Sequence, residues 1–416
     1  MEHIDTLVIG AGQGGVATSE HLRNQGIDHI VLERGRIAER WRSERWDSLK
    51  ANGPAWHDRF PNMAFSCDED DFADKESVAT YFEEYARMID APVRTGVTVE
   101  AVTPHTDRAG FHVRTSNGDF DALNVVSATG PFQKPSIPPI VPDTTEVTQI
   151  HSTAYRNPQA LAEGAVLVIG GGSSGSQIAA ELNDAGRDVY FSIGPHDRPF
   201  RRYRGRDNCW WLGVLGIWNM DTPAPGTEHV TIAVSGAHGG KTVDFRRLAE
   251  QGITLLGMTS GFEDGTLQIA DDLKTNINAG DDNYRSLMQA ADDYVKRTGI
   301  DLPTEPEAWD ITADPACVAD PIRSLNLAER GITTIIWATG FKFDYSWLHA
   351  ADALDEVGRP VHQRGVSKVP GLYFVGLPWQ SRRGSSFIWG VWHDAKFVVD
   401  QIAIQENYMR HHHRGT

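Results

Sequence analysis

Glycines in a fixed spacing are the first residues of this sequence that suggest a chemistry. A GxGxxG motif near the N-terminus contains Gly10, Gly12 and Gly15, and Glu33 ends the apolar segment that follows it. Gly10 allows a tight turn, Gly12 lets a pyrophosphate approach the backbone, and Gly15 lets a helix pack closely on a strand. A carboxylate at position 33 can accept hydrogen bonds from ribose hydroxyls. The pattern predicts a dinucleotide site, and the alternative is a glycine-rich structural turn.

A second motif of the same form lies later in the chain. It contains the residues expected to bind a second dinucleotide, which are Gly170, Gly172, Ser173, Ser174 and Gly175. Two such motifs in one chain predict two nucleotide sites.

A cluster of arginines follows the second motif, where the first motif has an acid. Ile193 corresponds to Glu33, and the basic residues that come next are Arg198, Arg201, Arg202, Arg204 and Arg206. Guanidinium groups suit a phosphate dianion, which a carboxylate would repel. We therefore expect NADPH rather than NADH, with the 2′-phosphate held by one of Arg198, Arg201, Arg202 and Arg204. The spacing leaves open which one, and the alternative is a solvated basic loop or an interdomain salt-bridge patch.

Apolar runs predict the strands and helices on either side of the two glycine motifs. Residues 6–9 form a strand of the buried parallel type, and a helix to about residue 24 and a strand at 29–33 follow. Residues 165–169 begin the same plan again, with a helix to about residue 184 and a strand at 189–192. The sequence predicts an α/β fold with two Rossmann-like dinucleotide-binding domains.

Later strands and a linker indicate how the domains share the chain. Residues 130–139 are rich in proline and should be stiff and extended, and apolar strands are expected at 124–129, 334–340 and 372–376. We expect a first dinucleotide-binding domain that is split in sequence, a second one inserted into it, and a flexible tail. Their predicted bounds are 1–150 with 330–405, then 155–325, then 406–416. The histidines near the C-terminus fit this solvated tail better than a metal site.

Composition excludes several classes of protein. The 416 residues contain 39 Lys and Arg against 56 Asp and Glu, a formal charge of −17, which argues against binding nucleic acid or anionic membranes. Cys67, Cys209 and Cys317 form no CxxC motif, so a disulfide framework, a common zinc site and a redox-active pair are not expected. No apolar stretch is long enough to span a membrane, and the acidic N-terminus is unlike a signal peptide. We expect a cytoplasmic protein without a metal.

Two nucleotide sites without a redox-active cysteine pair favour a particular chemistry. A nicotinamide that hands a hydride to a flavin fits best, with dioxygen as the acceptor of the electrons.

The order of the motifs resembles that of class B flavoprotein monooxygenases over nearly the whole chain. The shared motifs are the two GxGxxG turns, Ala128-Thr129-Gly130 with Pro135 and Pro138, His151 to Tyr155, and Ala338-Thr339-Gly340. Short bacterial members are the most similar, on the segment from Arg201 to Asp207. The resemblance implies FAD at the first turn, NADPH at the second, and cofactor contacts from Thr129, Gly130, Ala338, Thr339 and Gly340. It also implies a flavin C4a-hydroperoxide that gives one oxygen atom to nitrogen, sulfur or a carbonyl carbon of a small organic substrate.

The sequence departs from the family fingerprint FxGxxxHxxx(Y/F/W). Thr145 and Val147 replace its Phe and Gly, while His151 and Tyr155 remain. A Tyr in the last position is more typical of the N- or S-oxygenating and indole-pyruvate branches than of Baeyer–Villiger enzymes.

Asn52 is the candidate catalytic residue. The segment from Ser48 to Asn52 resembles the one in which flavin-containing monooxygenases carry an active-site Asn. An amide there can donate to the distal peroxide oxygen or position the substrate. The alternative is a simple turn, because Asn52-Gly53-Pro54 is strong turn chemistry.

Tryptophans and histidines give weaker signals. Nine of the twelve tryptophans fall into three local groups, namely Trp41, Trp46 and Trp56; Trp210, Trp211 and Trp218; and Trp379, Trp389 and Trp392. They are candidates for the walls of a flavin and substrate pocket, with Trp41 assigned to FAD, and ordinary core packing is the alternative. The helix expected after residues 382–386 would turn its N-terminus towards the flavin, unless this segment is a surface loop. No base is required for oxygen transfer, so His57, His196, His238 and His393 are interpreted as structural.

Two rival functions stay open at this point. One is an NADPH-linked redox sensor or regulator that does not oxygenate, and the other is an NADPH oxidase that releases peroxide. The sequence leaves the substrate and the oligomeric state open, and a homodimer is compatible with it.

Overall fold

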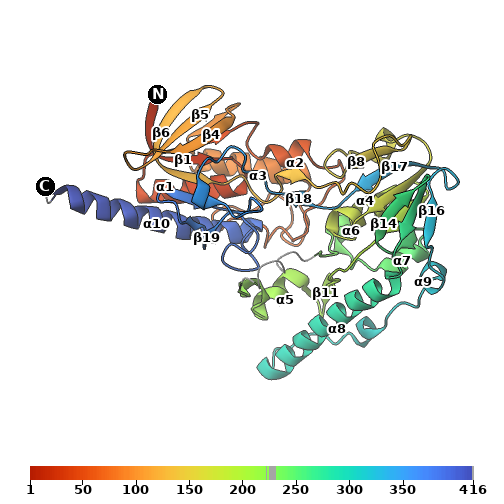
Figure 1. The fold of residues 1–416 in the computed structure, drawn as a ribbon. Helices are drawn as coiled ribbons and strands as arrows, with labels where there is room; N and C mark the ends of the chain where they lie inside the picture. The colour runs from red at the N-terminus through yellow and green to blue at the C-terminus, as the bar shows by residue number, and fades with distance from the viewer. Residues whose placement is uncertain (222, 224–230, 415–416) are drawn as a thin grey trace.

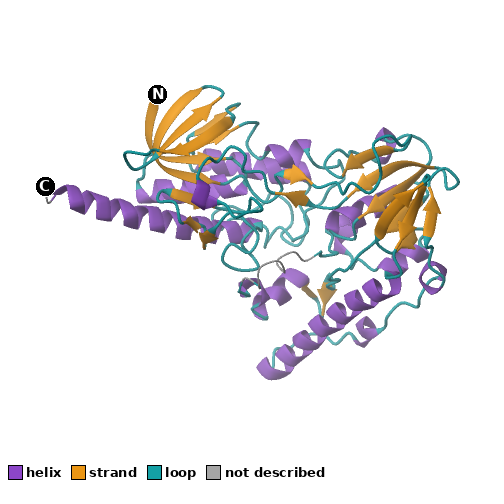
Figure 2. Ribbon diagram, in the orientation of Figure 1, coloured by secondary structure: helices purple, strands orange, loops and turns teal. Residues whose placement is uncertain are grey.

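The computed structural model describes residues 1–221, 223 and 231–414, and it shows two α/β units side by side (Figure 1). The N-terminal unit contains the N-terminus and the long C-terminal helix, and the second unit contains the strands of the middle of the chain (Figure 2). The two Rossmann-like units that the sequence predicts are confirmed.

The first unit is built on a sheet whose central strands are parallel. Its order is β19-β20-β21-β6-β1-β2-β3, with bounds β19 His362–Gln363, β20 Val366–Ser367, β21 Leu372–Phe374, β6 Gly118–Ser127, β1 Glu2–Ile9, β2 His29–Glu33 and β3 Val93–Thr95. Val8 of β1 lies opposite Val31 of β2 and Val126 of β6. Because this strand is covered on both faces, Thr6 to Ile9 are all buried, as the apolar run indicates.

Helices and a small antiparallel extension complete this unit. The antiparallel strands β4 Val99–Pro104 and β5 Phe111–Thr115 extend from β6. The helices are α1 Gln13–Gln25, α2 Glu39–Ser43, α3 Lys75–Met88 and α10 Ile388–Arg414. Helix α10 packs along α1 and projects beyond the body of the unit (Figure 1).

The second unit has a parallel sheet of its own. Its order is β13-β10-β9-β17-β8, with bounds β13 Thr254–Leu256, β10 Val189–Ser192, β9 Ala165–Ile169, β17 Ile332–Trp337 and β8 Thr148–His151. Antiparallel strands β14 Thr259–Glu263, β15 Thr266–Ile269 and β16 Ser324–Asn326 lie beside it. The principal helices are α4 Ser173–Asp184, α5 Asn208–Val214, α7 Phe245–Glu250 and α8 Leu273–Thr298, and α8 runs diagonally below the sheet (Figure 1).

The strand pairing shifts the expected domain boundaries. Both β8 and β17 pair in the second sheet, whereas the expected bounds divide them from it at residues 150 and 330. An apolar run predicts a strand but does not identify its neighbours, which explains the error. The chain crosses between the units at β7 Lys134–Pro135 and β18 Phe341–Lys342, which pair with each other.

The C-terminal segment is helical rather than a flexible tail. Helix α10 continues to Arg414, so residues 406–414 extend a helix that begins inside the first unit. Ion pairs of the (i, i+4) type from Lys396 to Asp400 and from Arg410 to Glu406 support this extension. Residues 415–416 of the expected tail lie outside the described residues. Among the helices described, none combines the length and apolar character that a membrane crossing requires.

Candidate functional site

The first glycine turn joins β1 to α1 and leaves space beside the helix N-terminus. Gly10 has a φ of +100°, and a Cβ there would lie 2.9 Å from the carbonyl oxygen of Ala128. A Cβ on Gly15 would overlap the carbonyl oxygen of Gly10. At Gly12, in contrast, nothing lies within 4 Å of a Cβ. Two glycines are therefore required for packing, while the third keeps a space open.

That space is part of a cavity of about 410 Å³. Its lining includes all but one of the residues predicted to bind the first dinucleotide, namely Gly10, Gly12, Glu33, Trp41, Thr129 and Gly130. Gly15, the remaining one, does not line it. The structure adds Arg45, Val97 to Val99, Phe132 and Trp347, which the sequence analysis missed. These residues come from several distant segments, so no local motif identifies them.

Glu33 is held in place by backbone donors. The N–H groups of Ala11 and Gly35 each donate to one of its carboxylate oxygens at 2.8 Å. Each oxygen keeps further acceptor capacity towards the cavity. The helix N-terminus, the open face of Gly12 and this carboxylate together fit the pyrophosphate and ribose of FAD.

The second glycine turn joins β9 to α4 and repeats the packing of the first. A Cβ on Gly175 would overlap the carbonyl oxygen of Gly170, and one on Gly170, whose φ is +118°, would overlap that of Ala338. Ala128 and Ala338 therefore occupy matching places against the two turns, which explains why a small residue begins each Ala-Thr-Gly motif. Thr339 joins the two segments that cross between the units, because its hydroxyl donates to the Ser136 carbonyl oxygen at 2.5 Å.

A backbone segment lies over the second turn. A Cβ on Gly172 would come within 3.4 Å of the Thr231 methyl group, and the Ser173 hydroxyl donates to the Ile232 carbonyl oxygen at 2.9 Å. The glycines and the start of α4, with Ser174 in its first turn, fit a pyrophosphate. Residues 231–232, however, lie where that pyrophosphate would approach Gly172.

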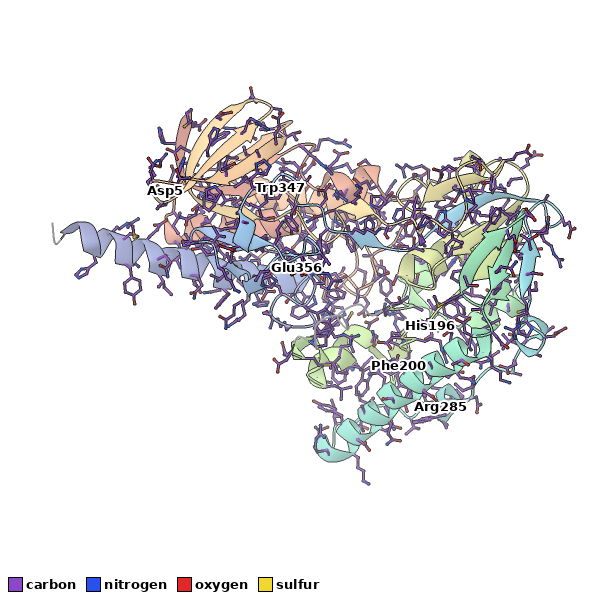
Figure 3. The ribbon with its side chains drawn as sticks, viewed as in Figure 1. Asp5, His196, Phe200, Arg285, Trp347 and Glu356 are labelled. Carbon is purple, nitrogen blue, oxygen red and sulfur yellow. The ribbon has the colours of Figure 1, made fainter. Side chains whose placement is uncertain are left out.

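Most arginines of the cluster have carboxylate partners within the protein. Arg198 is buried and pairs with Asp281 of α8 at 2.7 Å. Arg246 pairs with the other oxygen of Asp281 at 2.6 Å. Figure 3 shows the stretch of chain with His196 and Phe200 close to α8, where Phe200 packs against Tyr284.

Two further arginines of the cluster have internal partners. Arg201 is buried and binds Asp207 through two nitrogens, at 2.9 and 2.5 Å. Arg204 donates to Asp292 at 2.6 Å. Arg198, Arg201 and Arg204 are thus each bound to a carboxylate of the protein, and the prediction that one of them holds the 2′-phosphate stays a prediction. Arg202 is exposed and has no ion pair in the part of the chain that the structure describes.

Asn52 lies between the two units and not in the wall of the cavity. Its side-chain oxygen accepts a hydrogen bond from Gln177 of α4 at 3.2 Å. Its backbone carbonyl accepts one from Arg201 at 2.5 Å. Arg201 thus fixes the turn that carries Asn52, a role the sequence did not reveal.

The fingerprint residues His151 and Tyr155 are buried at the junction of the units. His151 Nε2 lies 3.0 Å from the Gly340 carbonyl oxygen, and burial lowers the pKa of its imidazole, which favours the neutral form. The Tyr155 hydroxyl donates to Glu181 of α4 at 2.8 Å. Both side chains therefore stabilise the junction instead of facing the cavity.

Three predicted tryptophans meet around one histidine. The rings of Trp56, Trp218 and Trp389 have centres 5.2 to 5.5 Å from that of His57 or of one another. His57 Nδ1 lies 2.8 Å from Asp58, so its place in this cluster is fixed. Trp46, Trp211 and Trp218 are buried in the core, in agreement with the alternative of ordinary core packing. Only Trp41 of the three groups lines the cavity.

The N-terminus of α10 adjoins the first glycine turn. The side-chain nitrogen of Gln13 donates to the Ser386 carbonyl oxygen at 2.8 Å, and Ser385 is fully buried. The segment before α10 is therefore packed against the FAD side and is not a free surface loop.

The cysteines do not approach one another in a redox pair. Cys67 is exposed, Cys209 is buried and Cys317 is partly buried, and all are free thiols. Burial raises the pKa of the Cys209 thiol well above its usual range, so it is not a reactive thiolate.

Comparison with known proteins assigns the family. Residues 7–198 match the family model described as pyridine nucleotide-disulphide oxidoreductase. The "uncharacterized oxidoreductase CzcO-like" of Geobacillus kaustophilus is 35% identical over 97% of this chain and 99% of its own. The indole-3-pyruvate monooxygenase YUCCA1 of Oryza sativa subsp. japonica is 28% identical over 91% of this chain and 88% of its own. A flavin-containing monooxygenase structure from Stenotrophomonas maltophilia superposes with a TM-score of 0.68 at 21% identity, over 97% of this chain and 99% of that one. The similarity to flavin monooxygenases in sequence and in fold agrees with the resemblance that the order of the motifs indicates. The chain belongs to the same family of oxidoreductases as the CzcO-like protein.

Proposed function

We propose that the protein is an FAD- and NADPH-dependent monooxygenase acting on a small organic substrate. Its flavin C4a-hydroperoxide would give one atom of dioxygen to a nitrogen, a sulfur or a carbonyl carbon. The observation that carries this proposal is the open cavity at the first glycine turn, joined in one chain to a second turn of the same construction. The absence of a cysteine pair among the described residues leaves dioxygen as the electron acceptor.

Residues around the first glycine turn support the proposed binding of FAD. Gly12 and the start of α1 bind the FAD pyrophosphate, Glu33 accepts hydrogen bonds from its ribose, and Trp41 forms a wall of the cavity. FAD, when bound, supplies the acceptor for hydride and the centre that reacts with dioxygen.

The proposed contribution of Asn52 is to orient the reacting groups. Within the part of the chain that the structure describes, its side-chain nitrogen makes no hydrogen bond, while its oxygen accepts one from Gln177. An amide held through its oxygen directs its N–H donors away from that partner. Such a donor can stabilise developing negative charge on an oxygen without any proton transfer.

The composition supports a proposal for the compartment and the partners of the protein. We propose a cytoplasmic enzyme whose partners are small molecules and not nucleic acid, because its free thiols and acidic surface suit that setting. The oligomeric state, including a homodimer, is open to a sedimentation measurement.

Two observations favour a second candidate function. Residues 231–232 lie over the second glycine turn, and Thr145 and Val147 depart from the family fingerprint. A protein that consumes NADPH slowly and only releases peroxide, or that acts as a redox sensor or regulator, would fit these features.

Oxygen and product measurements separate these functions. NADPH consumption, peroxide release and product formation are measured with panels of small amines, sulfides and ketones under ¹⁸O-labelled dioxygen. A monooxygenase places one labelled atom in the product for each NADPH consumed. Peroxide equal to NADPH with every panel member would identify an oxidase, and no oxygen consumption would identify a sensor.

A further inference from the structure

Arg45 is a half-buried cation in the proposed FAD cavity, and it has no carboxylate partner among the described residues. It follows α2 and lines the cavity together with Trp41 and Phe132. The centre of its guanidinium lies 5.8 Å from the ring centre of Trp41 and 5.5 Å from that of Phe132. Its side chain donates to the Glu44 carbonyl oxygen at 2.8 Å, and no described carboxylate forms an ion pair with it.

Other arginines of the same loop differ from Arg45 in this respect. Arg36 pairs with Glu39 at 2.7 Å, and Arg40 pairs with Glu44 at 2.9 Å. The Glu44 carboxylate, the nearest acid in sequence, is thus already bound by Arg40.

An unpaired guanidinium in such a place is energetically unfavourable. Desolvation lowers the pKa of Arg45 to about 10, with opposing effects from Glu44 and Arg40, so the group still carries its charge at neutral pH. A charge that is partly withdrawn from water is stable only when an opposite charge or hydrogen-bond acceptors compensate it. The two aromatic rings offer part of that compensation and also hold the planar fork in one orientation.

We propose that Arg45 is the residue that pairs with the negative charge of FAD in this cavity. The inference rests on the assignment of the cavity to FAD. FAD offers two anionic groups, the pyrophosphate and the pyrimidine part of the reduced flavin ring, and a guanidinium fork can bind either one. Arg45 is therefore a cofactor-binding residue, although neither glycine motif contains it.

The test compares the affinity of apoprotein for FAD in matched variants. Arg45→Met keeps the length and the contacts with both rings but removes the charge, Arg45→Lys keeps the charge but loses the fork, and Arg36→Met is the exposed control. FAD fluorescence gives the dissociation constant of the oxidised cofactor, and dye equilibration gives the midpoint potential.

The loss of one charge-assisted hydrogen-bonded contact predicts a specific change. If Arg45 binds the pyrophosphate, Arg45→Met raises the dissociation constant of oxidised FAD by about tenfold to a hundredfold, with little change in the midpoint potential. If it faces the reduced ring, the potential becomes more negative while the affinity for oxidised FAD changes less. Either result supports the proposal. In both measurements Arg45→Lys should lie between the wild type and Arg45→Met, and Arg36→Met should equal the wild type.

Folded Arg45→Met with wild-type affinity and potential would overturn the proposal. If Arg45→Met does not fold, Arg45→Lys decides, and equality with Arg36→Lys in both measurements overturns the proposal. Failure of the wild-type apoprotein itself to bind FAD would instead contradict the assignment of the cavity.

Discussion

At the first glycine turn, a side chain added at Gly12 should impair flavin binding, whereas one added at Gly15 should lower the stability of the fold. A Cβ on Gly12 meets nothing within 4 Å and the backbone φ is −81°, so Gly12→Val should fold normally but fill the space needed by the pyrophosphate. A Cβ on Gly15 overlaps the Gly10 carbonyl oxygen, so Gly15→Ala should lose about 1–3 kcal/mol of stability or more. Flavin absorbance per protein and urea unfolding distinguish the two. A flavin-bound, folded Gly12→Val would refute the placement of FAD.

The arginine cluster gives a second prediction at the scale of residues. Arg201→Ala leaves the buried Asp207 carboxylate without its partner, which should cost about 3–5 kcal/mol of unfolding free energy. Arg202→Ala should change stability by only about 0.5 kcal/mol, because the side chain is exposed. If Arg202 binds the 2′-phosphate, Arg202→Ala lowers the ratio of kcat/KM for NADPH to kcat/KM for NADH by about tenfold. An unchanged ratio would make the cluster purely structural.

Residues whose role is local could be predicted, and residues whose partners are distant could not. Gly10, Gly12, Gly15 and Glu33 belong to one strand-turn-helix-strand unit. The structure places Gly10, Gly12 and Glu33 around one cavity, with Gly15 packed behind Gly10. Arg198 looked like a phosphate ligand because its partner Asp281 lies 83 residues further along the chain.

At the scale of elements, binding of NADPH should displace the segment over the second glycine turn. The N–H of Asp197 donates to the Thr231 carbonyl oxygen at 2.7 Å, and that of Ala233 donates to Asp197 at 2.9 Å. A pyrophosphate at Gly172 needs the space beside Thr231, so these two bonds should open. Hydrogen exchange at Asp197 and Ala233 should therefore become faster with saturating NADP⁺, whereas exchange within β9 should not. Unchanged protection at both amides would show that the segment stays in place.

Strand β6 carries an acid whose ionisation should affect stability. Asp121 accepts hydrogen bonds from Arg108 at 2.6 Å and His105 at 2.8 Å, which lower its pKa to about 2. A carboxyl group with a depressed pKa stabilises the fold above its unfolded pKa of about 4, and this contribution is lost as the pH falls towards 2. Since Arg108 is half exposed, we expect the ionised Asp121 to contribute about 1 kcal/mol to the free energy of unfolding.

Comparison with Asp121→Asn isolates this effect. The difference in unfolding free energy between wild type and variant, measured by denaturant titration, should shrink as the pH falls below about 4. A difference that is constant with pH would assign the stabilisation to packing instead.

The elements themselves were largely predictable, while their partners were not. The strands His29–Glu33, Ala165–Ile169 and Val189–Ser192 occur at their predicted positions because buried parallel strands are continuous apolar runs. Strand β17 was expected in the first domain, yet it pairs with β9 of the second. Both assignments satisfy the same apolar pattern, so only the three-dimensional pairing separates them.

For the whole molecule, one loop of the first unit connects the two nucleotide-binding units. The Ser48 hydroxyl donates to Glu181 of α4 at 2.7 Å, Asp47 accepts from Asn157 at 2.7 Å, and Asn52 accepts from Gln177. The helix that begins at the second glycine turn therefore contacts the turn that carries the candidate catalytic residue. A change at this loop can affect hydride transfer, oxygen transfer or both.

Substitutions at Asn52 and at its partner should separate these effects. Asn52→Ala removes the proposed donor, and we expect about fivefold less product per NADPH with more peroxide, as the loss of one neutral hydrogen bond predicts. The anaerobic rate of flavin reduction should stay near that of the wild type, because hydride transfer depends on how the two rings are aligned. Gln177→Ala is the matched control, since it removes the contact with α4 and keeps the Asn52 side chain. If Gln177→Ala uncouples the reaction equally, Asn52 acts only through the contact between the units. If Asn52→Ala slows reduction instead, this side chain lies on the nicotinamide side of the flavin.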